Sequence, residues 1–200
     1  MSTLHNVKLG EIADIINGIP DTKQSELNNN VNAIIYNYIQ PNHLSNDTDV
    51  KDISAIKRQV PISDEYFIRK EDILVKRLNP DIATFINKDM PNTTFSSNLF
   101  VIRVRKDYYP TYIACFLENQ GMSWLNSNLV GSVSSIKSIS IKALVNLDIP
   151  RIEYKKQITI GHLWQLQKRK KELVDKLLRE DERLMTAVLD NVIADAKGEK

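Results

Sequence analysis

The sequence predicts an α+β protein, in which a globular domain of short strands and helices precedes one long C-terminal helix. Two observations support this fold class. Between Gln157 and Ala194 there is no proline, and leucine recurs at helical spacing. Before that stretch, short β-rich runs alternate with polar loops and turn signals. We therefore expect a globular domain over residues 1–152, the long helix over 153–196 and a short tail over 197–200.

The strands of the globular domain are predicted from β-rich runs that end at turn signals. Residues Val7–Ile16 mix a strand pattern with a helical one and lead into the turn signal Asn17-Gly18. Pro80 marks the end of one run, because proline cannot donate to a strand ladder. Strands are expected over Ala33–Ile39, Asp72–Leu78 and Leu99–Val104.

Two short helices are expected after these strands, and the run MSWLNSN at 122–128 could add another between them. Pro110 suits the first position of a helix, where its missing N–H loses no hydrogen bond, and that helix ends near Gln120-Gly121. A second helix over Ile139–Leu147 has Ser138 or Ser140 as its cap. Residues 147–150 then form a short strand or an extended exit into the long helix.

The leucines of the long helix form a narrow apolar seam, with members three, four or seven residues apart. The seam consists of Leu163, Leu166, Leu173, Leu177, Leu184 and Ala187. A helix over 157–194 is roughly 55 Å long at ~1.5 Å per residue, too long to fold back onto a small domain. We therefore expect the seam to be covered by antiparallel pairing with a second copy, giving a coiled coil and a homodimer.

The composition indicates the cellular compartment and excludes some classes of protein. The 200 residues contain one cysteine, so an intramolecular disulfide is excluded and a reducing compartment is expected. The N-terminus lacks the apolar core of a signal peptide, and no apolar run approaches the ~20 residues of a membrane span. We expect a soluble, cytoplasmic protein that does not bind membranes.

The charge is close to balanced. Residues 1–150 carry 15 Lys and Arg against 16 Asp and Glu, a net charge of −1, and residues 151–200 carry 12 against 9, a net charge of +3. A protein that coats nucleic acid through its overall field is far more basic. Any binding to nucleic acid must therefore use a local patch.

Signatures of catalysis, cofactor binding and metal binding are absent from the sequence. The six glycines are scattered and form no Gly-x-Gly loop for a cofactor. The run Asn79-Pro80-Asp81-Ile82 half-resembles the motif of amino-methyltransferases but lacks its stacking aromatic residue, so a turn after a strand is favoured. A nuclease metal site would need clustered carboxylates. Glu153-x-Lys155 and the distant Pro80-Asp81 supply two, and no third carboxylate is evident, so a solvated charge pair is favoured. The three histidines are dispersed. We expect no catalytic residues, no metal and no cofactor in this chain.

Two features could contact DNA. The first is the run Lys76-Arg77-Leu78-Asn79 at the end of a buried strand. A strand end holds an arginine firmly, and its side chain can bond two edge atoms of guanine. A polar cluster at 93–98 lies nearby, before the next strand. The loop Gly131–Ser135 with Lys137 could bind phosphate through backbone N–H groups and one charge. A solvated turn and a flexible connector are the respective alternatives, and the run Lys168–Lys171 is favoured as a solvated helix face. The candidate DNA-binding residues are Arg58, Lys76, Arg77, Asn79, Thr94, Ser97, Asn98, Ser132, Ser135 and Lys137.

Several segments, taken in order, are similar to those of a known family. They are VKLGEIADI at 7–15 with Gly18, IYNYI at 35–39, DILV at 72–75, Tyr112–Leu117 with Gly131-Ser132, and Ile139–Ile160 with its Leu144, Leu147, Pro150 and Gln157. Through them nearly the whole chain resembles the specificity (S) subunit of type I restriction-modification systems, in a half-length form. Glu71 stands where that family usually has glycine, and Ile152 and Glu153 stand where it has prolines.

The resemblance implies a fold and a set of partners. Full-length S subunits carry two target recognition domains, separated by two long helices paired antiparallel, and each domain reads one half of a split site in double-stranded DNA. They have no catalysis of their own and dock methyltransferase subunits, and through these the restriction subunits; S-adenosylmethionine, ATP and Mg are expected only in those partners. With one such domain over 1–152 and one helix, this chain is expected to dimerise and to read a bipartite palindrome.

Two other functions remain open at the level of sequence. The chain could be a dimeric protein–protein interaction module that does not bind DNA. It could also be the detached specificity half of a fused restriction-methylation enzyme. Retention on DNA that depends on salt would separate DNA binding from the first alternative.

Overall fold

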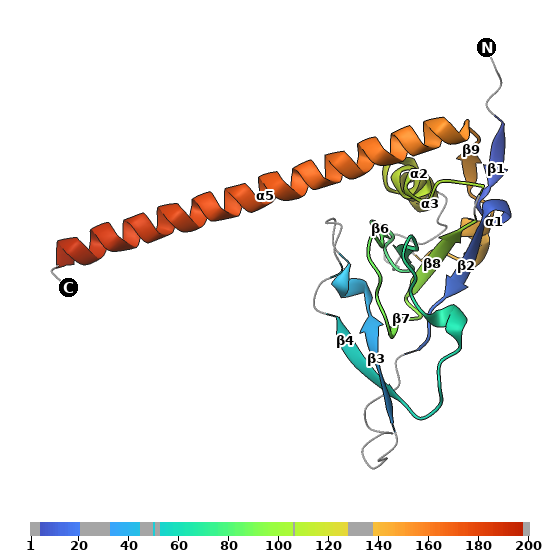
Figure 1. The fold of residues 1–200 in the computed structure, drawn as a ribbon, viewed down its shortest axis with the longest axis horizontal. Coiled ribbons are helices and arrows are strands. Elements are labelled where there is room, and N and C mark those ends of the chain that lie inside the picture. The colour runs from blue at the N-terminus through green and yellow to red at the C-terminus, as the bar shows by residue number, and fades with distance from the viewer. Residues whose placement is uncertain are drawn as a thin grey trace. The chain divides into compact units, whose positions relative to one another are not determined.

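A computed structural model describes residues 5–20, 33–44, 50, 53–105, 107–127 and 138–197 (Figure 1). The chain divides into two compact units, residues 1–164 and 165–200. Unit 1 contains all the strands of the described residues, and the α+β class predicted from the sequence is confirmed. The long helix begins in unit 1 and continues through unit 2.

Three small sheets form the framework of unit 1. The largest has the order β2-β8-β5-β6 and is antiparallel throughout. The second has the order β4-β3-β7, with β3 and β4 antiparallel and β3 and β7 parallel. β1 and β9 pair antiparallel, which joins the two ends of the domain. The strands are β1 (Asn6–Lys8), β2 (Ala13–Asn17), β3 (Ile34–Ile39), β4 (Ser54–Arg58), β5 (Ile73–Lys76), β6 (Ala83–Phe85), β7 (Thr93–Phe95), β8 (Leu99–Val104) and β9 (Asp148–Pro150).

The helices of unit 1 are short, whereas α5 has 44 residues. α2, a π-helical turn and α3 follow each other without a break. The helices are α1 (Leu9–Ile12), α2 (Pro110–Phe116), the π-helix Leu117–Gly121, α3 (Met122–Ser127), α4 (Ile141–Val145) and α5 (Tyr154–Lys197), with 3-10 turns at Pro41–His43 and Asp64–Tyr66.

The β2-β8-β5-β6 sheet is buried on both faces. Ile73 and Val75 of β5 point into a core to which α2, the π-helix, α3 and α4 contribute buried side chains. Leu74, between them, points into a second core with Ile39 and Phe95. This two-sided burial explains why β5 and β8 have continuous apolar runs rather than alternating ones.

A buried ion pair fixes the start of β5. The Asp72 carboxylate, 1% exposed, accepts hydrogen bonds from Arg103 Nε at 2.9 Å, Arg103 Nη2 at 2.8 Å and the Arg69 backbone N–H at 2.8 Å. The hydrogen bond to Asp72 raises the pKa of the Arg103 guanidinium, so the guanidinium stays charged. Arg103 Nη2 also donates to the Phe67 carbonyl, so both partners are satisfied and the position of β5 is well determined.

The first turns of α5 are packed onto the rest of unit 1. Gln157, 3% exposed, accepts a hydrogen bond from the Tyr109 N–H at 2.9 Å and donates to the Ile152 carbonyl. Trp164 Nε1 donates to Glu118 Oε2 of the π-helix at 2.7 Å, and its ring packs edge-on against Phe85. Polar and aromatic contacts therefore attach residues 154–164 of α5 to the helices above the sheet.

Most predicted elements are present, with differences at their ends. Pro110 is the first residue of α2, and the Ser140 hydroxyl caps α4 by accepting from the Ala143 N–H. The helix predicted over 157–194 runs from Tyr154 to Lys197. β4, β6 and β7 were not predicted, and two of them have only three residues, so their pairing depends on neighbours distant in the sequence.

Candidate nucleic-acid interface

Arg77 lies at an edge of unit 1 where three segments meet. Its backbone N–H donates to the Asn98 carbonyl at 2.9 Å, and its own carbonyl accepts from the Ile139 N–H at 2.8 Å. Leu78 forms a bridge with Ser138. The backbone on either side of the Arg77 side chain is therefore held by β8 and by the segment before α4. We call Arg77, Asn79 and Asn98 the strand-end edge.

The side chains of the strand-end edge are exposed. Among the residues that the structure describes, no hydrogen bond or ion pair is recorded for the Arg77 guanidinium. Asn79 has a φ of 46°, in the left-handed region that asparagine tolerates better than most residues, and its exposed amide lies at a bend three residues after β5. An exposed cation beside two exposed amides is suited to hydrogen bonds with base edges or phosphates.

Lys76 differs from its neighbour Arg77. Its Nζ is 3.2 Å from Asp81 Oδ1, and its side chain is 18% exposed. The charge of Lys76 is therefore largely compensated within unit 1. Of the two basic residues predicted at this strand end, Arg77 is the one that presents its charge to solvent.

The side chains of two other predicted contacts form hydrogen bonds within unit 1. Thr94 is fully buried, and its hydroxyl donates to the Tyr66 carbonyl at 2.9 Å, so the prediction that it contacts DNA is corrected. Arg58 is partly buried and donates through Nη2 to the Pro20 carbonyl, which ties β4 to the segment after β2. Ser97 is partly exposed, in the turn between β7 and β8, beside Asn98.

The predicted phosphate-binding loop cannot be compared with the structure. Ser132, Ser135 and Lys137 lie outside the described residues. Their role stays a prediction.

The predicted seam lies on α5. Leu163, Leu166, Leu173, Leu177 and Leu184 are each at least half exposed, and Ala187 is exposed as well. Such a row of exposed leucines on one helix is typical of a surface that another helix covers.

A second apolar row, which was not predicted, lies on the same helix. Val174, Leu178 and Met185 each follow a seam leucine by one residue, which places them about 100° further around the helix. Val188 and Val192 continue this row, and all five side chains are at least 45% exposed. The signal was present in the sequence as the paired apolar residues 173–174, 177–178 and 184–185. Together the two rows are wider than the seam of a two-stranded coiled coil.

Two features of the described residues bear on metal and ligand binding. Within them there is no group of three or more His, Cys, Asp or Glu side chains that could hold a metal ion. A hollow of about 470 Å³ beside α3 has a single charged group among its described lining residues, Asp148, which pairs with Lys8 at 2.8 Å. Such a lining favours no phosphate-bearing cofactor. In the same part of the chain, no helix is both long and apolar enough to cross a membrane.

Comparisons with known proteins agree on one family. The model of the type I restriction modification DNA specificity domain matches residues 1–177. No curated protein matches the sequence significantly.

Solved structures of this fold have low sequence identity to the chain. The S subunit of a type I restriction-modification system from M. genitalium has a TM-score of 0.60 at 16% identity, over 90% of this chain and 42% of that one. The HsdS subunit from Thermoanaerobacter tengcongensis has a TM-score of 0.61 at 16% identity, over 96% of this chain and 48% of that one. A chain from a structure on complex assembly and conformational transition of the type I R-M system has a TM-score of 0.67 at 15% identity, over 96% and 49%. This chain therefore spans about half the length of the solved structures that it matches.

Proposed function

This chain belongs to the family of type I restriction modification DNA specificity domains, and from this premise we propose that it is a DNA sequence-recognition subunit of a type I restriction-modification enzyme. It reads one half-site through unit 1, dimerises through α5 and docks methyltransferase subunits. The observation that carries the DNA-reading part is the exposed Arg77 at the end of a strand whose position is fixed on both sides.

The strand-end edge suits base reading better than general DNA binding. Residues 1–150 have a net charge of −1, so their overall field does not attract a polyanion. Discrimination then depends on a few well-placed hydrogen bonds, for which an arginine on a fixed backbone, with two parallel N–H donors, is well suited. We expect binding by the isolated chain to be weak and to become stronger when a methyltransferase partner encloses the duplex.

The dimer is proposed from the seam. Five half-exposed leucines on one side of α5 are costly to leave in water, and a second α5 running antiparallel would cover them. Two identical recognition domains related by a two-fold axis would read a bipartite palindrome. Half-site centres roughly 10 base pairs apart, about one turn of DNA, would suit such a dimer.

The second apolar row supports docking of a further subunit. One partner helix covers only the seam, which leaves Val174, Leu178 and Met185 accessible on one side of the pair. An apolar surface on a methyltransferase subunit would complete their burial. Catalysis is assigned to that partner, together with the binding of S-adenosylmethionine.

The test is co-expression with a methyltransferase subunit encoded beside this chain, followed by mapping of methylated bases in the host DNA. We expect one split palindromic motif that is absent when this chain is omitted. The purified chain incubated with labelled S-adenosylmethionine and DNA should leave the DNA unlabelled. A protein–protein interaction module would give no motif and no retention on DNA at low salt, and either result would contradict the proposed function.

A further inference from the structure

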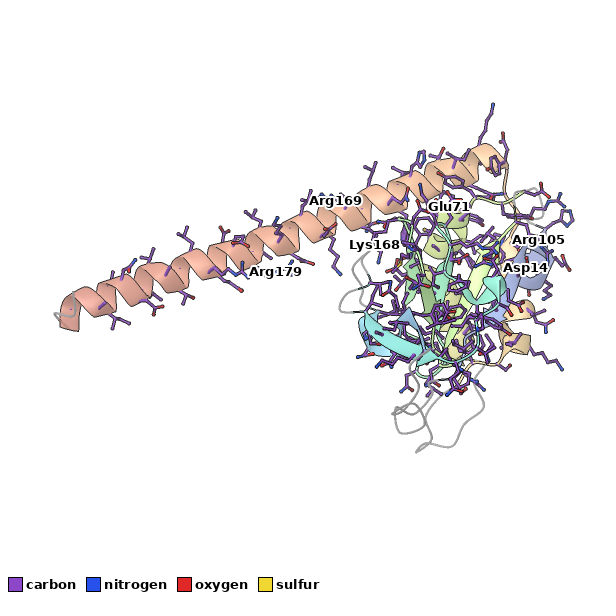
Figure 2. The ribbon with its side chains drawn as sticks, turned by 60° about the horizontal axis from the view of Figure 1, so that its bottom comes forward. Asp14, Glu71, Arg105, Lys168, Arg169 and Arg179 are labelled. Atoms are coloured by element: carbon purple, nitrogen blue, oxygen red, sulfur yellow. The ribbon has the colours of Figure 1, made fainter. Side chains whose placement is uncertain are left out.

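The side of α5 opposite the second apolar row is basic. Lys176 and Arg183 each precede a seam leucine by one residue, so they lie about 100° from the seam in the other direction. Arg169 lies seven residues before Lys176, and Arg179 lies one turn before Arg183. We call Arg169, Lys176, Arg179 and Arg183 the basic row; Figure 2 labels Arg169 and Arg179 on the helix.

The acidic residues on this helix compensate only half of the basic row. Arg169 Nη1 is 2.8 Å from Glu172 Oε2, and Arg183 Nη1 is 2.9 Å from Glu180 Oε1. Lys176 and Arg179 are exposed, and no ion pair is recorded for either within the described residues. Residues 169–183 carry six Lys and Arg against five Asp and Glu, a net charge of +1, and Lys176 and Arg179 are the two members of the basic row for which no ion pair is recorded among the described residues.

A two-fold symmetric helix pair places both basic rows on the same side. In an antiparallel pair whose seams face each other, the symmetry axis runs perpendicular to the plane of the two helices. The side of each helix that carries the basic row then lies beside the same side of the partner helix. Flanking positions of paired helices commonly attract each other through opposite charges. Here like charges adjoin, so pairing of the two helices adds no counter-charge for Lys176 and Arg179.

We propose that the basic row binds phosphates of the DNA spacer between the two half-sites. The inference rests on the proposed function, because it requires the dimer to straddle DNA. The symmetry axis of a dimer on a palindrome also passes through the centre of the site, so one flank of the helix pair must face the spacer. The charge of the phosphates selects the basic flank, and the second apolar row then faces away from the DNA. Spacer contacts of this kind stabilise binding without reading any base.

The inference is tested with the complex of this chain and its methyltransferase subunit. The DNA is a duplex that carries the mapped site, compared with the same duplex in which the spacer phosphates are neutral methylphosphonates. The variant Lys176→Gln/Arg179→Gln removes two charges from each helix. The control Lys155→Gln/Lys156→Gln removes the same net charge from two exposed positions in the first turn of the same helix, outside the basic row.

We expect the Lys176→Gln/Arg179→Gln complex to bind the natural duplex roughly 10-fold more weakly than wild type, and to lower the slope of log affinity against log salt by about two to four per dimer. Its methylation motif should be unchanged, and sedimentation should find it dimeric. On the duplex with the neutral spacer, wild type and variant should bind equally. The control should bind both duplexes as wild type does.

Two results would overturn the inference. One is a variant that binds the natural duplex as tightly as the control complex does. The other is wild-type affinity that does not fall when the spacer is neutralised, which is informative even if the variant fails to assemble. A wild-type complex that retains no DNA at all would instead contradict the proposed function, and the inference with it.

Discussion

Glu71 adopts a backbone conformation that favours glycine. Its φ is 73°, in the left-handed region, and it directly precedes Asp72 at the start of β5. The backbone N–H donates to the Ile86 carbonyl at 2.8 Å, which holds the residue there, while its side chain is exposed (Figure 2). The resembling family usually has glycine at this position, and the positive φ explains why a residue without Cβ suits it.

Replacing Glu71 with glycine should therefore stabilise the chain. A residue with a Cβ costs about 1 kcal/mol in the left-handed region, and we expect Glu71→Gly to raise the free energy of unfolding by up to that amount. Urea denaturation followed by circular dichroism measures the change. The control is Lys70→Gly, at the preceding exposed position without a positive φ, which should lower the same quantity. A Glu71→Gly chain less stable than wild type would contradict this account.

Arg77 is the residue on which discrimination between bases should depend. Arg77→Ala is expected to weaken binding to the mapped site by roughly 1–3 kcal/mol and to relax discrimination at one position in each half-site. Lys137→Ala provides the contrast, because a phosphate contact should weaken mapped and random DNA alike and lower the salt slope by about one per domain. Competition binding with single-base variants of the site measures both effects. Unchanged affinity and site choice after Arg77→Ala would show that Arg77 is a structural residue and that other residues read the DNA.

At the scale of elements, the sequence predicts those whose signals are local. Pro110 and Ser140 mark helix starts through their own backbone chemistry, and the leucine spacing of α5 identifies it without tertiary information. β7 could not be predicted, because Thr93 and Thr94 are buried only once β3 lies beside them. The same burial removes Thr94 from the predicted DNA contacts. A hydroxyl that serves the interior cannot be distinguished from one at a surface by composition alone.

Packing of the first turns of α5 within unit 1 depends on close approach at Gly161. A Cβ on this residue would lie 2.1 Å from Thr111 Oγ1 and 2.9 Å from the Tyr109 ring, so neither neighbour could stay in place. We expect Gly161→Ala to lower the free energy of unfolding by about 1–3 kcal/mol, although alanine is the better helix former.

Thermal unfolding followed by near-ultraviolet circular dichroism measures the Gly161→Ala effect, because the aromatic residues Tyr109 and Trp164 lie at this contact. The control is Thr159→Ala, an exposed position on the same helix, which should be nearly neutral. If Gly161→Ala unfolds at the same temperature as that control, the close packing of the helix is not required.

At the scale of the whole molecule, the two units have different sources of stability. Unit 1 has its own cores on both faces of a sheet. The part of α5 in unit 2 has no core of its own, since its leucines are exposed along the helix. An isolated helix is held mainly by the packing of its apolar face, so the state of unit 2 should depend on association.

Leu177 lies in the middle of the seam and tests the dimer directly. Leu177→Asp would place an unpaired carboxylate between two paired helices, at several kcal/mol per dimer. We expect sedimentation velocity at tens of micromolar protein to find wild type as a dimer and the Leu177→Asp chain as a monomer. Thr186→Asp adds the same charge away from the seam and should leave the dimer intact. Because unit 1 does not depend on the seam, its near-ultraviolet spectrum should be unchanged in both variants. A wild-type chain that stays monomeric at this concentration without a partner would refute the homodimer, and the bipartite palindrome would lose its structural basis.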